Sequence, residues 1–333
     1  MRITSFVARV SWWTGVVHFF YFLNRRRKRI ITFHNVLRDV LWREGMANGV
    51  SCNESEFREI VKECGRRFGF STDLFDASTL TITFDDGYQN QYSTAFRVLR
   101  ELNIPAYVFV SGGLDDKPLV IDRLLVWVAE VPDGRYVFDF NARHHELVLE
   151  DKASRREAWI KTLWHLFIDD NDTKGNGLLA TLDALFPLTE IRHRLPPDYW
   201  TERCTGISED ELSEMRSAGW KVGWHTANHY PLGRLSDEEV KEELGAPPIF
   251  MDVCFSFPYG GDQTVDDRSL EAVKRAGFPC AVSNTTVSRN NSSRWFMPRM
   301  QLVADRYLLH FQLSGLHHFL KYRKLLPMID GFQ

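Results

Sequence analysis

The sequence predicts an α/β fold in which parallel strands alternate with helices. Short runs rich in β-branched and aromatic residues recur after residue 29, and amphipathic segments that begin with helix-capping residues stand between them. The 333 residues are 44% hydrophobic and 26% charged, which is ordinary for a globular protein. Such alternation is typical of βα units, which assemble into a parallel sheet or a barrel.

The first half of the pattern begins with the strand Ile30-Ile31-Thr32-Phe33-His34. A helix follows, capped near Asn53 or Ser55, because its apolar residues recur at helical spacing. The predicted elements are a strand at 30–34, a helix at 53–68, a strand at 80–84, a helix at 92–102 and a strand at 106–111.

Residues 114–205 interrupt this alternation. They contain an apparent hairpin at 133–151 and helical stretches at 155–168 and 177–185. We interpret the segment as a long insertion at the carboxyl end of a strand, where enzymes with parallel βα units build the walls of their substrate sites.

The alternation then returns with a helix whose first residues, Ser208 to Glu211, form a capping box. The remaining predicted elements are helices at 208–218, 237–244 and 268–276 and strands at 220–224, 253–257 and 280–283.

The N-terminal residues 1–29 differ from the rest of the chain. Residues 3–23 are apolar and aromatic, and the basic run Arg25-Arg26-Arg27-Lys28-Arg29 follows, without the pattern of a secretory signal peptide. One interpretation is a helix that lies in or crosses a membrane, with its aromatic residues at the headgroup boundary and the basic run on an anionic cytoplasmic leaflet. Those aromatic residues are Trp12, Trp13, Phe19, Phe20 and Tyr21. The other interpretation is an amphipathic helix packed on the body of the protein.

Charge and cysteine content exclude some functions. The formal net charge of -3 gives no overall basic field, which argues against a nucleic-acid partner. The five cysteines are scattered and form no CxxC pair, so the sequence indicates a reducing compartment and offers no cysteine-based zinc site.

Three short motifs each follow a predicted strand: TFDDG at 83–87, HTANH at 225–229 and FPYG at 257–260. The carboxyl ends of parallel strands open on one rim, so the motifs should meet there. Two adjacent ionised aspartates repel each other, and a bound cation relieves that repulsion. Two histidines four residues apart can reach one ion. The motifs together indicate a metal site, although each alone is also compatible with an ordinary turn or with structural histidines.

In their order and spacing across about residues 30–316, these motifs resemble those of the polysaccharide deacetylase (NodB-homology) family of carbohydrate esterases. The resemblance implies a distorted, incomplete (β/α) barrel and metal-dependent hydrolysis of an N-acetyl or related acyl group on a sugar. It divides the chain into a membrane-associating helix and basic run at 1–29, a barrel at 30–316 with the insertion 114–205, and a tail at 317–333.

The resemblance also assigns roles. Asp86, His225 and His229 look like the metal ligands, and Asp85 looks like the general base. The backbone N–H of Tyr259, between Pro258 and Gly260 in a substrate-binding loop, looks like an oxyanion donor.

Two further roles rest on departures from the family pattern. Much of the family carries an arginine where Ser256 stands, whereas a subgroup has a later Pro-Arg pair, matched by Pro298-Arg299. We therefore expect Arg299 to orient Asp85 by a charge-assisted hydrogen bond; a structural salt bridge is the alternative. For the general acid, the Leu308-Leu309-His310 sequence matches the family's L-x-H motif, and His34 at the end of the first strand is the rival.

The sequence thus predicts a hydrolase that removes an acyl group, with acetyl as the first candidate, from an amino sugar in a lipid-linked or nascent surface-glycan precursor. It predicts that the enzyme binds a divalent metal, with zinc as the first choice and cobalt, nickel or iron as alternatives. It also predicts that the enzyme acts at the cytoplasmic side of a membrane, which residues 1–29 contact. A catalytically silent carbohydrate-binding protein on the same barrel is the alternative function. A non-heme iron oxygenase, which also uses two histidines and a carboxylate, usually has a different, double-stranded β framework.

Overall fold

The computed structural model describes residues 2–41, 51–112, 118–169, 176–191, 194–261, 264–284 and 294–327. Its centre is a parallel sheet in which β1, β5, β6 and β9 are neighbours in that order and β4 also pairs with β5. The strands of this sheet are β1 (Arg29–Phe33), β4 (Gly69–Phe70), β5 (Thr79–Phe84), β6 (Tyr107–Val110) and β9 (Lys221–Trp224).

A second parallel sheet continues the curve of the first. It contains β10 (Phe255–Ser256), β11 (Ala281–Ser283) and β12 (Met297–Pro298). A bridge between Ile31 and Met300 joins this sheet to β1, whereas in the described part of the chain no strand pairing joins β9 to β10. The barrel is therefore incomplete, which confirms the predicted α/β fold with a parallel central sheet.

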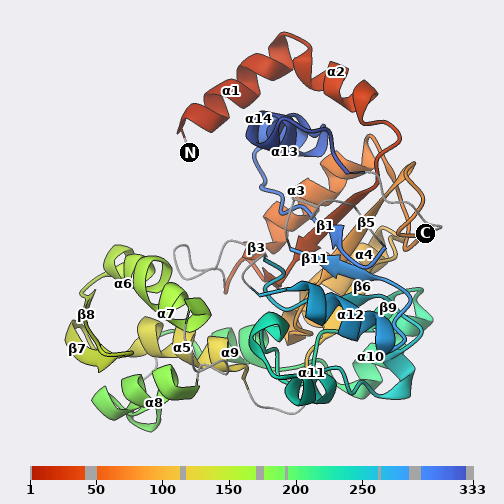
Figure 1. Ribbon diagram of the computed structural model, residues 1–333. Helices are drawn as coiled ribbons and strands as arrows, with labels where there is room; N and C mark the ends of the chain where they lie inside the picture. The colour runs from red at the N-terminus through yellow and green to blue at the C-terminus, as the bar shows by residue number, and fades with distance from the viewer. Residues whose placement is uncertain are drawn as a thin grey trace.

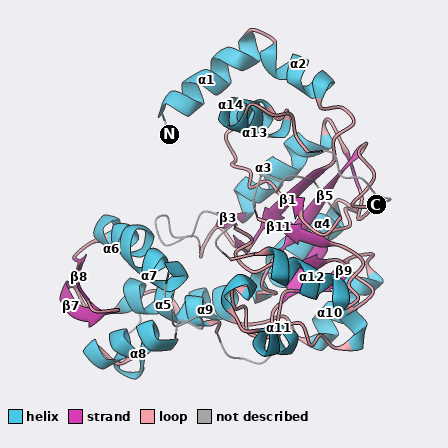
Figure 2. Cartoon of the chain, in the orientation of Figure 1, coloured by secondary structure: helices cyan, strands magenta, loops and turns pink. Residues whose placement is uncertain are grey.

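Apart from the short β4, which is not buried, the barrel strands are largely buried because helices cover them from outside (Figure 2). All five residues of β1 and five of the six residues of β5 are buried. The covering helices are α3 (Glu54–Gly65), α4 (Arg97–Glu101), α10 (Glu209–Ser217), α11 (Asp237–Glu243) and α12 (Asp267–Arg275). A short parallel pair, β2 (Asn35–Leu37) and β3 (Ser51–Asn53), lies beside them.

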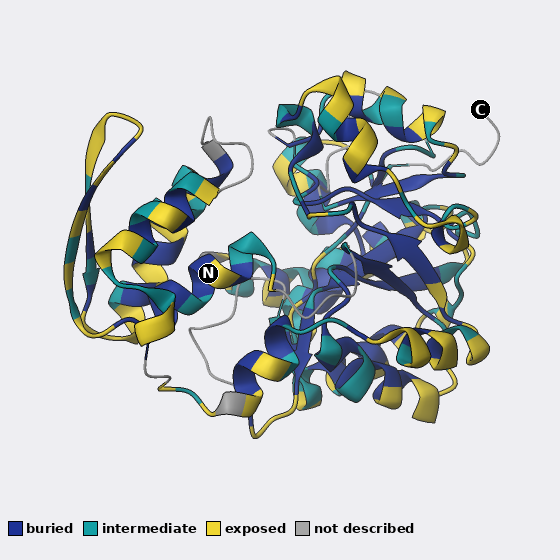
Figure 3. Cartoon of the chain, turned by 90° about the horizontal axis from the view of Figure 1, so that it is seen from below, coloured by how far each residue is buried: buried dark blue, intermediate teal, exposed yellow. Residues whose placement is uncertain are grey.

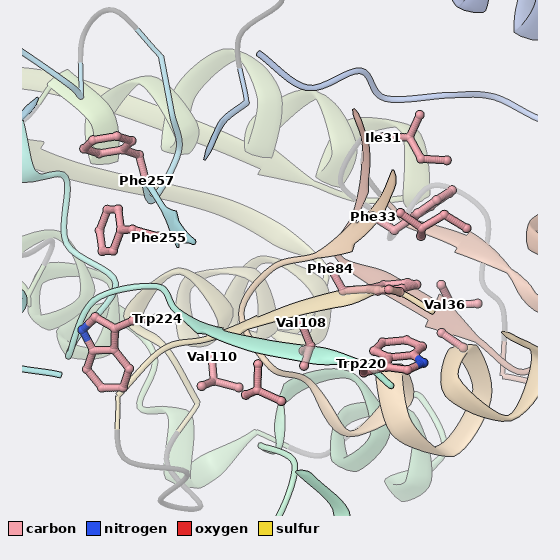
Figure 4. Packing of buried hydrophobic residues seen from close by; sticks show 14 of the residues in the cluster. Ile31, Phe33, Val36, Phe84, Val108, Val110, Trp220, Trp224, Phe255 and Phe257 are labelled. Carbon is pink, nitrogen blue, oxygen red and sulfur yellow. The ribbon is translucent and has the colours of Figure 1, made fainter. Parts of the chain in front are cut away.

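Aromatic stacking fixes the strand that carries the two aspartates. Phe84, the last residue of β5, stacks on Trp220 with ring centroids 5.4 Å apart, and Phe33 stacks on its other side at 5.8 Å (Figure 4). All three side chains are buried. Fully burying a side chain of this size contributes about 1.5–3 kcal/mol, so the end of β5 has little freedom to move.

The predicted insertion forms a lobe beside the barrel (Figures 1 and 3). It has its own buried cluster, which includes Trp127, Phe138 and Leu147, and its first residues, 114–117, lie outside the described residues. The lobe contains α5 (Val120–Glu130), β7 (Gly134–Phe140), β8 (Arg143–Leu149), α6 (Lys152–Ala158), α7 (Trp164–Asp169), α8 (Asn176–Leu185) and α9 (Pro197–Cys204). Strands β7 and β8 form an antiparallel hairpin.

The two ends of the chain lie together. Helices α1 (Arg2–Trp13) and α2 (Val16–Leu23) arch over α13 (Arg306–Leu313) and α14 (Leu316–Tyr322) (Figure 1). Among the described residues, no helix has both the length and the apolar character needed to cross a membrane. Residues 317–322 of the predicted tail belong to α14, and 328–333 lie outside the described residues. All five cysteines are free and buried.

Candidate active site

The three motifs meet at the carboxyl ends of the barrel strands. Asp85 and Asp86 follow β5, His225 follows β9, and Phe257 follows β10. The ladder continues one residue beyond each strand, because Asp85 N donates to Phe33 O at 3.1 Å and His225 N donates to Val110 O at 2.9 Å. The side chains that follow are therefore held on backbone that is still part of the sheet.

Asp86, His225 and His229 converge in a buried cluster. Each offers one ligand atom, and these atoms lie within 4.8 Å of one another. His225 Nε2 and His229 Nε2 are 3.4 and 3.1 Å from Asp86 Oδ1. The side chains are at most 6% exposed, and none of the three atoms has a hydrogen-bond partner in the described structure.

These unpartnered atoms fit a divalent cation. Leaving a buried polar atom unpaired costs about 1–3 kcal/mol, and one ion would satisfy all three at once. Two imidazoles and one carboxylate suit zinc, cobalt, nickel or iron. The residues present therefore fit the metal that the sequence predicted.

Hydrogen bonds orient both imidazoles toward Asp86. His225 Nδ1 bonds to the Ser256 carbonyl at 2.7 Å, and His229 Nδ1 bonds to the Tyr259 hydroxyl at 3.0 Å. A carbonyl can only accept, so His225 Nδ1 carries the proton and Nε2 presents its lone pair to the cluster. Such partners fix the ring orientation that a metal ligand needs.

The loops that carry these residues hold an unusual backbone. Asp86, Thr226, His229 and Tyr259 have φ of 78°, 69°, 58° and 59°, a conformation that costs a non-glycine residue roughly 1–3 kcal/mol. Gly87 follows with φ 78°, and a Cβ there would lie 2.7 Å from Val110 Cγ1. The surrounding structure maintains this strain, as is common at functional sites.

Asp85 is held by a buried network. Arg299 Nη1 donates to its Oδ1 at 2.7 Å and Arg299 Nη2 to its Oδ2 at 2.5 Å, with both side chains fully buried. Ser256 Oγ donates to Oδ1 at 3.0 Å and Asn284 Nδ2 to Oδ2 at 3.3 Å. Burial, the largest single effect, would raise the pKa of Asp85, but the charges of Arg299, His225 and His34 and the Arg299 hydrogen bonds together outweigh it, and the pKa falls to about 2.

Ser256 and Asn284 are site residues that the sequence analysis did not assign. Arg299 Nη2 donates to Ser256 Oγ at 2.9 Å and to Asn284 Oδ1 at 2.6 Å, so the guanidinium lies beside the position where much of the family carries its arginine. The departure at Ser256 was the clue to this neighbourhood. Nothing in the sequence indicated Asn284.

The two candidate general acids have different positions. His34 lies in the site, with Nε2 3.7 Å from Asp85 Oδ2, a side chain 13% exposed and Nδ1 unpartnered. Burial lowers its pKa, although the Asp86 and Asp85 charges oppose this.

The structure does not bring His310 to the site, contrary to the expectation from the L-x-H sequence. His310 lies in α13, where Nδ1 bonds to the Tyr21 hydroxyl at 2.9 Å and its ring stacks on Trp12. Its Nε2 lies 3.3 Å from Glu63 Oε2. The reason for the error is that the matching letters fall within a helix that packs under the N-terminal helices instead of at the end of a strand.

The predicted substrate loop connects the barrel to the lobe. Pro258 is buried, and Gly260 has φ 62°, where a Cβ would lie 2.3 Å from the backbone N of Asn284. The Tyr259 ring packs against Trp164 and Phe167 of the lobe, with centroids 6.0 and 5.6 Å apart. The lobe therefore touches a residue that orients His229.

A cavity of about 290 Å³ opens beside Asp86. The barrel contributes Tyr88 and Asn228 to its lining, and the lobe contributes Leu119 and Cys204. Tyr88 also donates to both carboxylate oxygens of the buried Asp122, at 2.9 and 3.0 Å. Burial, together with the Asp86 charge, raises the pKa of Asp122 to about 7.

Comparisons with known proteins agree with this arrangement. The family model described as polysaccharide deacetylase matches residues 74–134 and 198–281, on either side of most of the lobe. No curated protein gives a significant match. The chain is similar to the Streptococcus pyogenes deacetylase PplD in complex with acetate, with 12% identity, 86% of this chain and 97% of that chain covered, and a TM-score of 0.51.

Two further solved structures are also similar. IcaB from Ammonifex degensii has 15% identity and a TM-score of 0.44, with 87% of this chain and 97% of that chain covered. A de-N-acetylase from Aggregatibacter actinomycetemcomitans has 13% identity and a TM-score of 0.44, with 84% and 96% covered. The family match on both sides of the lobe, the PplD-like fold and the three motifs on one rim make the chain similar to the polysaccharide deacetylase family over residues 74–134 and 198–281.

Proposed function

We propose that the protein is a metal-dependent hydrolase that removes an N-acetyl or related acyl group from an amino sugar. The observation that carries this proposal is the set of three unpartnered, buried ligand atoms of Asp86, His225 and His229, which lie within 4.8 Å of one another. Asp85 beside them is ionised and fixed by Arg299. A site for binding alone would not need a second buried carboxylate held in this way.

Asp86, His225 and His229 would hold the cation, for which zinc is the first choice and cobalt, nickel or iron are alternatives. When bound, a divalent cation acts as a Lewis acid on an acyl carbonyl and lowers the pKa of water from 15.7 to about 7.

Asp85 serves as the general base in this proposal. With a pKa of about 2 it is ionised throughout the neutral range, so it is ready to accept a proton from the attacking water. The two-pronged contact with Arg299 fixes the carboxylate plane, which makes Arg299 a positioning residue.

His34 serves as the general acid for the leaving amine. Its imidazole is neutral at rest because burial lowers its pKa, and the negative charges of Asp86 and Asp85 favour its protonation once a proton is released nearby. Its Nδ1 is buried and has no hydrogen-bond partner in the described structure, so this ring nitrogen is not committed to another group. The backbone N–H of Tyr259 is the proposed oxyanion donor, within the loop Pro258 to Gly260.

The size of the cavity supports a small substrate unit. At about 290 Å³ it lies at the lower end of ligand pockets, which are roughly 300–1,000 Å³. That volume suits one acylated sugar residue better than a long polymer segment.

We therefore propose a lipid-linked or nascent surface-glycan precursor as the substrate, handled at the cytoplasmic side of a membrane that residues 1–29 contact. Arg25 and Arg26, which are exposed in the basic run, and the five free cysteines support this location, whereas Lys28 and Arg29 of the run are buried.

The test is acetate release from N-acetylated sugars, presented as lipid-linked precursors and as chitin oligomers. We expect turnover of the lipid-linked substrate, none of chitin oligomers, and loss of turnover in Asp85→Asn. Asp210→Asn, an exposed aspartate in the first turn of α10, is the matched control and should retain full activity. Undiminished activity of Asp85→Asn would refute the assignment of the base.

A further inference from the structure

Helices α1 and α2 form an arm, residues 2–23, whose inner face is docked on the C-terminal helices (Figure 1). Ala8, Val17 and Phe20 are buried there in one cluster with Phe311 and Leu316. Of the aromatic residues expected at a membrane boundary, Phe20 is therefore buried, and Trp12 and Tyr21 also pack against this cluster. The arm is thus amphipathic, and three of its seven aromatic residues pack on the body of the protein.

Polar bonds hold the arm and the segment after it in place. Tyr21 bonds to His310 at 2.9 Å, Asn24 Nδ2 donates to the Ser314 carbonyl at 2.9 Å, and Arg29 Nε donates to the Leu313 carbonyl at 2.7 Å. Asn24 is fully buried. The arm is therefore a fixed element, and its outer face is presented to the surroundings without any refolding.

That outer face is strongly apolar. It consists of six exposed hydrophobic residues: Phe6, Val10, Trp13, Val16, Phe19 and Phe22. Trp13 is 77% exposed and Phe6 68% exposed. In the described structure, four of the exposed large hydrophobic side chains are aromatic, and all four lie on this face. Exposed apolar side chains gathered in this way on two successive helices indicate an interaction surface.

Positive charge surrounds this face. Positions 1–38 contain eight lysines or arginines and no aspartate or glutamate, although the whole chain has a net charge of -3. Of these eight, Lys28 and Arg29 are buried and Arg38 pairs with Glu202. Arg9, Arg25 and Arg26 are exposed on or just after the arm. The neighbouring α14, which contacts α2 through Phe20 and Phe319, ends in an exposed basic group formed by Lys321, Arg323 and Lys324.

We infer that the outer face of the arm binds the surface of an anionic lipid bilayer, with its aromatic side chains at the headgroup level and its basic residues on the lipid phosphates. Aromatic residues beside lysines and arginines on an amphipathic helix are typical of such interfacial segments. A second copy of the chain is a poor occupant because it would bring two basic faces together. The inference extends the proposed membrane contact to a defined surface and does not depend on hydrolysis.

The experiment is cosedimentation of the purified full chain with vesicles of phosphatidylcholine alone and of phosphatidylcholine with phosphatidylglycerol at about 3:1. We expect strong binding to the anionic vesicles, weak binding to the neutral ones, and a decrease with added salt. Trp13→Ser/Phe19→Ser/Phe22→Ser should weaken binding more than about 100-fold, and Arg25→Gln/Arg26→Gln about tenfold or more on anionic vesicles only.

The control is Leu102→Ser/Val137→Ser/Ile249→Ser, which removes exposed apolar residues of similar exposure elsewhere on the molecule. It should bind vesicles like the wild type, and both triple variants should keep their circular dichroism spectra and their turnover of a soluble acetylated sugar. Equal vesicle binding by the arm variant and the wild type would overturn the inference. So would a wild-type dimer in light scattering that the arm variant converts to a monomer without lipid. Either result would leave the proposed hydrolysis standing, because the vesicle assay involves no turnover.

Discussion

Asp85 and Arg299 form an ion pair in which neither side chain is exposed to solvent. Removing one partner of such a pair leaves an uncompensated buried charge, so we expect Arg299→Met to lower the free energy of unfolding by about 3–5 kcal/mol. Asp85→Asn/Arg299→Met should recover much of that loss, because no charge remains unpaired. Urea unfolding of the two variants measures both values. A single variant that loses less than about 1 kcal/mol would show that Arg299 does not compensate the charge of Asp85.

His34 and His310 are a matched pair for testing the general acid. His34 lies 3.7 Å from Asp85, whereas His310 is engaged with Tyr21 and Glu63 under the arm. We expect His34→Gln to lower kcat about 10²- to 10⁴-fold and His310→Gln to leave kcat per folded molecule within about twofold. Steady-state kinetics with a soluble acetylated sugar distinguishes the two. The reverse order of effects would restore His310 as the acid and require the arm to be displaced.

Asp122 makes stability depend on pH. Its pKa in the folded protein is raised to about 7 from the ordinary value of 3.8, so the folded state binds a proton that the unfolded state releases. The stabilisation that Asp122 provides is therefore complete below about pH 4 and is lost as the pH rises toward 7. This loss lowers the free energy of unfolding by at most about 4 kcal/mol. We expect Asp122→Asn to remove this slope when unfolding is measured from pH 4 to 8 in chelated protein. An unchanged slope would assign the pH dependence to other groups.

Helices and strands differ in how far the sequence could predict them. The capping boxes at Asn53 and Ser208 lie within four residues of their partners, and both helices begin there as expected. Strands β1 and β5 also agree with their buried apolar runs. Local sequence was less informative for 253–257, of which only Phe255–Ser256 is strand, because pairing with β11 decides where β10 ends.

The docking of the arm is the element that local sequence left open, since an apolar helix can face lipid or protein. Asn24 joins three segments: its side chain bonds to the carbonyls of Phe20 and Ser314 and accepts from Leu326 N. We expect Asn24→Ala to lower the free energy of unfolding by about 1–3 kcal/mol and to speed amide exchange in α1 and α2. Asn228→Ala, which removes an amide side chain from the other end of the barrel, is the control for exchange in the arm. Unchanged exchange in Asn24→Ala would mean that apolar contacts alone hold the arm.

At the scale of the whole molecule, the order of the motifs predicted that Asp86, His225 and His229 meet, because parallel strands deliver their carboxyl ends to one rim. The remainder of the site depends on contacts between distant positions. Asn284 and Ser256 reach Asp85 across 199 and 171 residues. The contact between Tyr88 and Asp122 depends on how the lobe packs on the barrel. No local pattern encodes these distances, so only the assembled fold could reveal them.

The most informative measurement is anomalous diffraction at the zinc absorption edge. The crystals are grown from protein that has been stripped of metal with a chelator and then reloaded with zinc. We predict one peak per chain, bound by a carboxylate oxygen of Asp86 and by Nε2 of His225 and of His229. His225→Ala crystals should lose the peak, whereas His144→Ala crystals, which lack an exposed imidazole of the β7–β8 hairpin, should keep it. A reloaded crystal with no density between these three side chains, or with zinc bound elsewhere, would contradict the metal-dependent hydrolase proposed for this site.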